Sequence, residues 1–86
     1  GRAMGNIVPP GTVVLLKAVD RDAIIPGGEY VIVCRKIVTL RIVRLAEGED
    51  KLRLVAGDRE NYDDIILNVS DISSVYKVKG KLIINS

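Results

Sequence analysis

The 86-residue sequence contains no histidine, and this absence excludes the most common catalytic base and metal ligand. Without histidine, neither a Ser-His-Asp triad nor a Cys-His dyad can be assembled from the chain. Cys34 is the only cysteine, so the ligand set of a structural zinc site is lacking as well. The acidic residues of the loops follow no recognised cation-binding pattern. We therefore expect no bound metal and no cofactor.

The single cysteine and the short apolar runs also bear on the cell compartment. One cysteine allows no disulfide within the chain, which is typical of cytoplasmic proteins. No apolar run approaches the roughly 20 residues that a membrane-spanning helix needs, and no signal peptide is recognisable. Cys34 itself lies in an apolar stretch, where a free cysteine is usually a small buried side chain. The sequence predicts a cytoplasmic protein without membrane contact.

Phenylalanine and tryptophan are absent, and the apolar residues are mostly valine, isoleucine and leucine. Such β-branched residues favour strands, and no segment shows the 3.6-residue apolar period of a helix. The length suits one domain, residues 1–86. The formal net charge of +2 is mild and does not by itself require a nucleic-acid partner. We expect an all-β fold with six or seven strands in a curled sheet or small barrel.

Alternating apolar residues and turn residues divide the chain into segments. Turns are predicted at Pro26-Gly27-Gly28 and at Glu47-Gly48-Glu49-Asp50, and a weakly signalled turn at Arg35-Lys36. The predicted strands are Val13 to Lys17, Glu29 to Cys34, Ile37 to Leu45, a segment around Leu52 and Leu54, Ile65 to Val69, and Ser74 to Ile84.

The last predicted strand has the clearest alternation. Lysines at 77, 79 and 81 occupy one face, and we interpret them as a solvated surface that discourages uncontrolled edge pairing. The opposite face carries an apolar set that is a candidate dimer interface: Tyr76, Val78, Leu82 and Ile84, with Gly80 between them. Contact of this lysine face with the phosphates of a nucleic acid is the minor alternative to a solvated surface.

The opening segment resembles the nucleophile loop of the S24 peptidases, the LexA-like family of self-cleaving repressors. Gly1, Met4, Pro9 and Gly11 fall at the spacing of that loop, followed by Thr12 and an apolar strand. Four later segments resemble family segments in the same order: Ile25 to Ile32, Val38 to Leu45, Leu52 to Tyr62, and Ile72 to Lys81. The resemblance covers nearly the whole chain and implies a LexA/signal-peptidase-like curled sheet or β-ribbon fold.

Members of this family cut peptide bonds with a serine that is activated by a neutral lysine. At the positions that match, this chain has Ala3 in place of the serine and Arg41 in place of the lysine. Alanine has no atom that can attack a carbonyl, and a guanidinium keeps its proton at physiological pH. The resemblance therefore implies a domain that has lost proteolysis, and we expect no catalytic residue.

Arg41 has apolar neighbours on both faces of its predicted strand, which indicates that it is buried. A buried guanidinium needs a carboxylate or several carbonyl groups around it. We expect a structural ion pair, with a partner among Glu29, Asp20, Asp22, Asp63 and Asp64.

Together these features predict a catalytically inactive, peptidase-like dimerisation and regulatory domain of a bacterial or phage-type transcriptional regulator. The resemblance implies a homodimer that reaches DNA through an upstream domain not in this chain. A peptide segment in the cleft around Ala3 and Arg41 is a further expected partner.

Two other interpretations remain open from the sequence. In the first, the chain is an active Ser-Lys self-cleaving repressor that is captured with its serine replaced by Ala3. In the second, it is a small β-barrel that binds nucleic acid directly.

Overall fold

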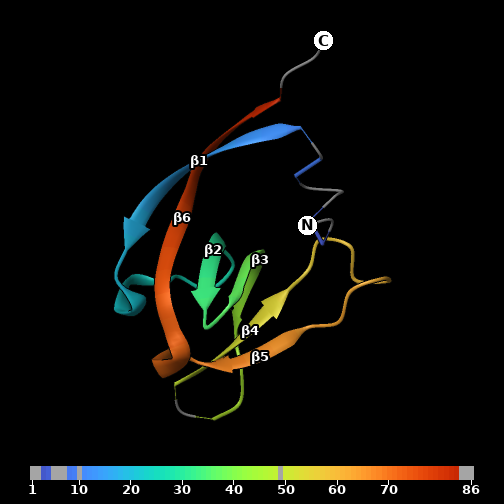
Figure 1. The fold of residues 1–86 in the computed structure, drawn as a ribbon. Coiled ribbons are helices and arrows are strands. Elements are labelled where there is room, and N and C mark those ends of the chain that lie inside the picture. Colours follow the sequence, from blue (N-terminus) through green and yellow to red (C-terminus); the bar gives the residue numbers. More distant parts are fainter. Residues whose placement is uncertain (1–2, 5–7, 10, 49, 84–86) are drawn as a thin grey trace.

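The computed structural model describes residues 3–4, 8–9, 11–48 and 50–83, and these ranges form one curled antiparallel sheet (Figure 1). The strand order is β1-β6-β2-β3-β4-β5. The strands are β1 (Thr12–Val19), β2 (Glu29–Cys34), β3 (Ile37–Leu45), β4 (Lys51–Val55), β5 (Ile65–Asn68) and β6 (Ile72–Ile83), with short 3-10 helices η1 (Arg21–Ala23) and η2 (Val69–Asp71). The predicted all-β fold is confirmed. Within these ranges no helix is long and apolar enough to cross a bilayer.

The predicted strands match the structure closely, and β2 and β3 have the expected bounds. Other boundaries differ by one or two residues. β1 runs from Thr12 to Val19 rather than from Val13 to Lys17, β6 begins at Ile72 rather than Ser74, and Val69 begins η2 rather than ending β5. The turn between β2 and β3 was weakly signalled because it contains no glycine. Arg35 there adopts a positive φ of 56°, which a non-glycine residue rarely does.

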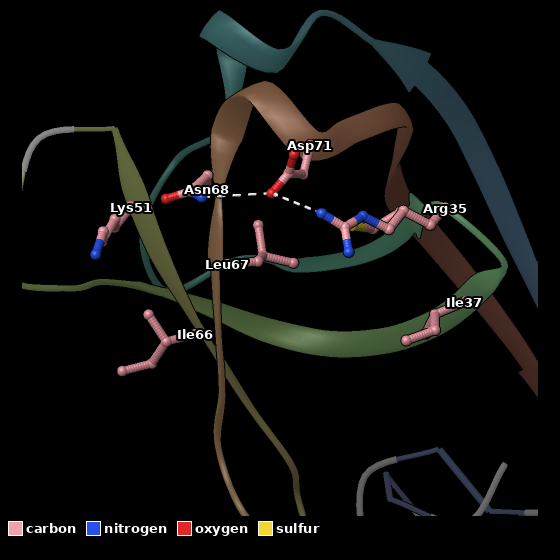
Figure 2. A pocket seen from close by; sticks show the side chains of 8 residues that line it. Arg35, Ile37, Lys51, Ile66, Leu67, Asn68 and Asp71 are labelled. Carbon is pink, nitrogen blue, oxygen red and sulfur yellow. Dashed lines mark hydrogen bonds and ion pairs between the residues drawn. The ribbon is translucent and has the colours of Figure 1, made fainter.

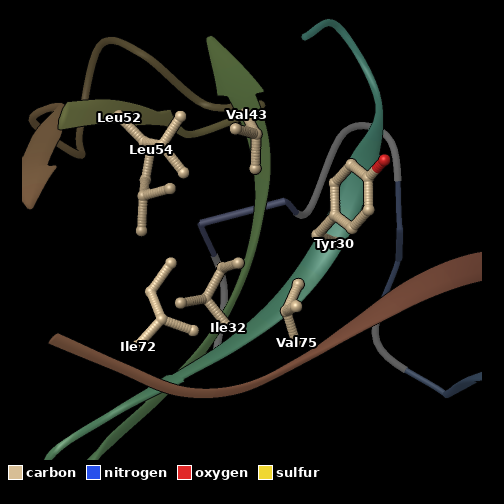
Figure 3. Close-up of a cluster of buried hydrophobic side chains, with 7 residues drawn as sticks. All are labelled: Tyr30, Ile32, Val43, Leu52, Leu54, Ile72 and Val75. Atoms are coloured by element: carbon tan, nitrogen blue, oxygen red, sulfur yellow. The ribbon is translucent and has the colours of Figure 1, made fainter. Parts of the chain in front are cut away.

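The hydrophobic core lies on the inner face of the curled sheet. Tyr30, Ile32, Val43 and Leu54 are fully buried, and they pack with side chains from β4 and β6 (Figure 3). Tyr30 also receives a hydrogen bond at its hydroxyl from the Ile25 main-chain N–H, at 2.9 Å. Burying one such side chain contributes about 1.5–3 kcal/mol to the free energy of unfolding.

β6 does not keep one apolar face along its whole length. Its pairing with β1 shifts by one residue, so that Leu15 lies opposite Gly80 and Leu16 lies opposite Val78. Leu15 and Leu16 are consecutive residues of β1 and therefore point to opposite faces of the sheet, and each residue of β6 lies on the same face as its partner in β1. Gly80 and Val78 therefore lie on opposite faces as well. The predicted single face is wrong for this reason: Leu82, beyond the shift, lies on the face opposite to that of Val78.

Beyond the shift, β1 and β6 form a two-stranded arm. β2 pairs with β6 only as far as Lys77, so the rest of β6 pairs with β1 alone. Figure 1 shows this pair projecting past the other strands. The arm exposes several large apolar side chains: Val13, Leu15, Leu16, Leu82 and Ile83. Ile84, a predicted interface residue, lies outside the described residues.

Candidate functional site

The segment with Ala3 and Met4 is held against the loop that follows β4. The Ala3 carbonyl accepts a hydrogen bond from the Asp58 N–H at 2.9 Å, and the Met4 sulfur accepts one from the Gly57 N–H at 3.2 Å. Both Ala3 and Met4 are buried. The main chain at Ala3 is therefore fixed by contacts that do not depend on the chemistry of its side chain.

A tight corner connects this segment to β1. The Thr12 hydroxyl donates a hydrogen bond to the Pro9 carbonyl at 2.6 Å, and the Thr12 N–H donates to the same carbonyl at 3.1 Å. Gly11 has a positive φ of 86°, which glycine adopts without steric cost. These contacts account for the predicted role of Pro9 and Gly11 in shaping the loop. Gly1, the remaining residue of that prediction, lies outside the described residues.

Ala3 lines a cavity of about 130 Å³ between the N-terminal segment and β3. The wall from the N-terminal segment consists of Ala3, Met4 and Val8, and the wall from β3 consists of Val38, Thr39 and Leu40. Apart from the Thr39 hydroxyl, the side chains lining the cavity are apolar. The structure therefore brings the predicted serine position to a small apolar cavity beside a strand.

This part of β3 has an open edge towards the cavity. The main chain of Val43 faces β2, because its N–H donates to Gly28 at 2.9 Å and its carbonyl accepts from Gly27 at 2.7 Å. Main-chain groups alternate along a strand, so those of Val38 and Leu40 face away from β2. β4 pairs with β3 only from Ile42 onwards, and no other described strand reaches this edge.

Arg41 is buried, as predicted, with 7% of its surface exposed. Its Nε donates a hydrogen bond to the Thr39 hydroxyl at 3.1 Å, and one terminal nitrogen donates to the Asp63 main-chain carbonyl at 3.2 Å. Among the described residues it has no ion pair. The expected carboxylate partner was therefore wrong: Asp63 contributes its carbonyl oxygen, and neutral acceptors hold the guanidinium.

The other predicted partners of Arg41 have different contacts. Glu29 binds Lys81 at 2.7 Å, and Asp64 accepts from Arg53 and Arg59 at 3.2 and 3.5 Å. Asp20 and Asp22 are exposed, at the end of β1 and in η1. The carboxylates of Glu29 and Asp64 thus bind cations that are more exposed than Arg41.

Thr39 links the two predicted dyad positions. It lines the cavity together with Ala3 and accepts a hydrogen bond from Arg41. Since its oxygen accepts from Arg41, its proton remains available for an acceptor in the cavity. Sequence reasoning missed Thr39, although a hydroxyl two residues before a buried arginine lies on the same strand face and is its natural partner.

The lysines of β6 are not one solvated face, contrary to expectation. The Lys77 ammonium lies 4.8 Å from the centre of the Tyr30 ring, a cation–π contact on the inner face. Lys81 pairs with Glu29, and both side chains are less than one-third exposed. Lys79, at the register shift, is exposed.

The predicted interface residues differ in exposure. Tyr76 and Val78 are half-buried within the sheet, whereas Leu82 is 58% exposed on the arm. The Leu15 side chain lies over Gly80, because a Cβ added there would stand 3.4 Å from a Leu15 methyl carbon. Leu82 shares that face with Leu15 and Val13.

The site as described can bind an apolar group and an acceptor, and it offers no nucleophile or base at the two dyad positions. Within the described ranges no cluster of three or more Asp, Glu or Cys residues is arranged to hold a metal ion. Comparison with known proteins gives no match to a family model, to a curated protein or to a solved structure, so the resemblance to the S24 peptidases stands on the residues quoted above.

Proposed function

We propose that this chain is a catalytically inactive, peptidase-like domain that dimerises and so regulates a bacterial or phage-type transcriptional regulator in the cytoplasm. DNA contact belongs to an upstream domain of the longer protein. Two weak DNA-binding domains joined in a dimer gain affinity through their effective concentration, without new contacts.

One observation carries the inactive-peptidase part of the proposal. Ala3 and Thr39 line the same cavity, and Arg41 is bonded to Thr39 behind it. The position that the resemblance assigns to the nucleophile thus shares a cavity with Thr39, whose hydroxyl binds the side chain at the position assigned to the base, and this contact supports the proposal. Neither side chain can perform the reaction, because alanine lacks a nucleophilic atom and the guanidinium cannot accept a proton.

The arm supports the dimerisation part of the proposal. Its exposed apolar side chains gather on a two-stranded ribbon that projects from the sheet. A contiguous apolar surface of this kind is typical of an interface with another protein. Val13, Leu15 and Leu82 share one face and give a two-fold partner a self-complementary apolar patch.

Sedimentation equilibrium tests the dimer. We expect the chain to sediment as a dimer at micromolar concentration, and Leu82→Glu to weaken dimerisation at least tenfold, because it places a charge in the apolar contact. Ile25→Glu is the matched control, since Ile25 is 62% exposed but lies outside the arm. A monomer at high micromolar concentration contradicts the proposal, and so does a dimer that is indifferent to Leu82→Glu.

Mass spectrometry of the full-length natural protein tests the loss of catalysis. Under conditions that trigger self-cleaving repressors, we expect the intact chain to persist. Fragments produced by self-cleavage would support an active enzyme instead. A shift of oligonucleotides by residues 1–86 alone, with an affinity that falls steeply as salt rises, would support a nucleic-acid-binding barrel.

A second candidate function is peptide docking at the cavity beside Ala3. The open edge of β3 favours it, because no described strand pairs with the main-chain groups of Val38 and Leu40 that face away from β2, and both residues line that cavity. A peptide can add to such an edge as a further strand. Leu40→Pro removes one of the outward N–H groups and is expected to abolish binding of an extended apolar peptide, followed by amide NMR shifts. Binding that survives Leu40→Pro contradicts this function.

A further inference from the structure

A second and larger cavity, of about 300 Å³, lies between the β2–β3 turn and β5 (Figure 2). Cys34, Arg35 and Ile37 form one wall. The opposite wall consists of Ile66, Leu67 and Asn68 of β5, with Lys51 and Asp71 at its margins. The cavity is separate from the one beside Ala3 and has no residue in common with it.

β5 is the last strand of the sheet that the described residues form, and no described strand pairs with its outer edge. Val43 faces β2, so the main-chain groups of the next residue of β3, Arg44, face β4. Its partner Arg53 therefore faces β3, and the main-chain groups of the neighbouring Leu52 face β5. Leu52 pairs with Leu67, whose main chain therefore faces β4. The main-chain N–H and carbonyl groups of the neighbours Ile66 and Asn68 therefore face away from β4, at the edge where both residues line the second cavity.

The side chains around this edge combine an apolar surface with an excess of positive charge. Ile37 and Ile66 are 57% and 52% exposed, so both leave apolar surface uncovered. Arg35 and Lys51 are exposed cations, and Asp71 is the one carboxylate of the lining. The contact of Arg35 with Asp71 is long, at 3.8 Å, and the Asp71 oxygen also accepts from Asn68 at 3.4 Å.

We propose that this cavity binds an extended acidic peptide, which adds to β5 as a seventh strand. The outward main-chain groups of Ile66 and Asn68 provide the hydrogen bonds for strand addition. Side chains of an added strand alternate between the two faces of the sheet. Acidic side chains on one face meet Lys51, which shares the outer face with Asn68 and Ile66. Apolar side chains on the other face contact Leu67 and Ile37.

Charge complementarity selects an acidic occupant. Arg35 and Lys51 leave a net positive charge after Asp71 is counted, and opposite charges directly across neighbouring strands stabilise pairing. A basic peptide meets two cations and is repelled. The partner is therefore a segment in which acidic and apolar residues alternate.

Amide NMR titration of the whole chain with two capped peptides tests the proposal. The first probe alternates Glu and Val over six residues, and the second alternates Lys and Val. We expect the Glu peptide to shift and protect from exchange the amides of Ile66 and Asn68, with at least tenfold weaker binding of the Lys peptide. Equal binding of the two peptides, or no shift at millimolar Glu peptide, overturns the proposal.

A proline at 66 separates strand addition from simple charge attraction. Ile66→Pro removes an outward N–H and leaves the pairing with β4 intact, because proline is tolerated on the free side of an edge strand. We expect this variant to fold and to lose binding of the Glu peptide at least tenfold. Leu67→Pro is the contrasting variant, since it removes an N–H that pairs with β4 and is expected to destabilise the fold. Undiminished binding by folded Ile66→Pro overturns the proposal.

Two further measurements apply even where the proline variant fails to fold. The double variant Arg35→Ser with Lys51→Ser is expected to lose at least tenfold in affinity and to lose most of the salt dependence of binding. A Glu peptide that is N-methylated at alternate residues cannot complete the ladder, and we expect it not to bind. Full affinity in either measurement overturns the proposal. Shifts at Val38 and Leu40 instead of β5 assign the peptide to the other cavity and overturn it too.

Discussion

Two cavities flank the β2–β3 hairpin, and each has an arginine next to it in a different setting. Arg41, beside the cavity of Ala3, is buried and held by the neutral oxygens of Thr39 and Asp63. Arg35, beside the β5 cavity, has a side chain that is 79% exposed, and its partner is the carboxylate of Asp71 at 3.8 Å. Arg41 is thus the more deeply buried of the two, and among the described residues it has no carboxylate partner.

From this difference in burial we expect Arg41 to contribute much more than Arg35 to the free energy of unfolding. An exposed ion pair gains little, because water and salt screen it and two long side chains lose freedom. A buried hydrogen-bonded cation is costly to disturb, since each group left without a partner pays its full desolvation penalty. We therefore expect substitutions at the buried hydrogen bonds of Arg41 to cost more stability than substitutions at the exposed pair of Arg35.

Arg41→Ala should have the largest effect on the free energy of unfolding. Removing the guanidinium leaves a void and deprives Thr39 and Asp63 of a donor, with an expected loss of about 3 kcal/mol. Urea unfolding followed by circular dichroism measures it. Arg41→Met, which fills the space without a charge, is the control and should cost less. A loss below about 0.5 kcal/mol for Arg41→Ala would contradict the expectation that the buried arginine contributes more to the free energy of unfolding than the exposed Arg35.

Thr39→Val should have the next largest effect. The change keeps the shape of the side chain but removes the acceptor of the Arg41 Nε–H, with an expected loss of about 1–2 kcal/mol. In a double-mutant cycle, the loss should nearly vanish when Arg41 is already alanine. Additive losses would show that Thr39 stabilises the fold independently of Arg41.

Glu29→Gln tests an ion pair whose side chains are more exposed than that of Arg41 and less exposed than that of Arg35. Its partner Lys81 lies at 2.7 Å, with side chains 23% and 29% exposed respectively. We expect a loss of about 0.5–1 kcal/mol that shrinks as salt is added. Glu47→Gln, at an exposed loop position, is the control and should change nothing measurable. A loss that does not depend on salt would indicate packing rather than charge.

Arg35→Ala should have the smallest effect on stability, within about 0.5 kcal/mol, as is usual for an exposed position. The measurement is the urea midpoint at low salt, where exposed pairs are strongest. Arg35→Gly is the informative companion, because it relieves the positive φ of 56° and should stabilise the turn. A loss of unfolding free energy for Arg35→Ala as large as that for Arg41→Ala would show that exposure does not separate the two arginines.

The sequence predicted most of the strands, because alternation of apolar and polar residues is a local property that each strand carries by itself. The buried state of Arg41 was predicted for the same reason. Asp63 was among its predicted partners, but through its carboxylate. The approach of the Asp63 carbonyl was not predicted, since it depends on the path of a loop 22 residues later. An acidic residue can be recognised in a sequence as a possible partner of an arginine. A main-chain carbonyl cannot, because every residue has one.

Two other features depend on pairing between distant strands. The shift in β6 moves Leu82 to the opposite face, and no residue in β6 signals it because the shift exists only relative to β1. The β5 cavity requires the β2–β3 turn to lie across from β5, which follows from the curl of the sheet. Both concern candidate binding surfaces, so the surfaces were less predictable than the fold.

The pairing of Thr12 with Ile83 also bears on the order in which the protein folds. The β2–β3 hairpin joins neighbouring residues through a two-residue turn and can form early. The arm closes the long loop between β1 and β6, and the entropy of that closure is lost before its contacts form. During synthesis β1 cannot pair until β6 has left the ribosome, so the proposed dimer surface is assembled after the β2–β3 hairpin.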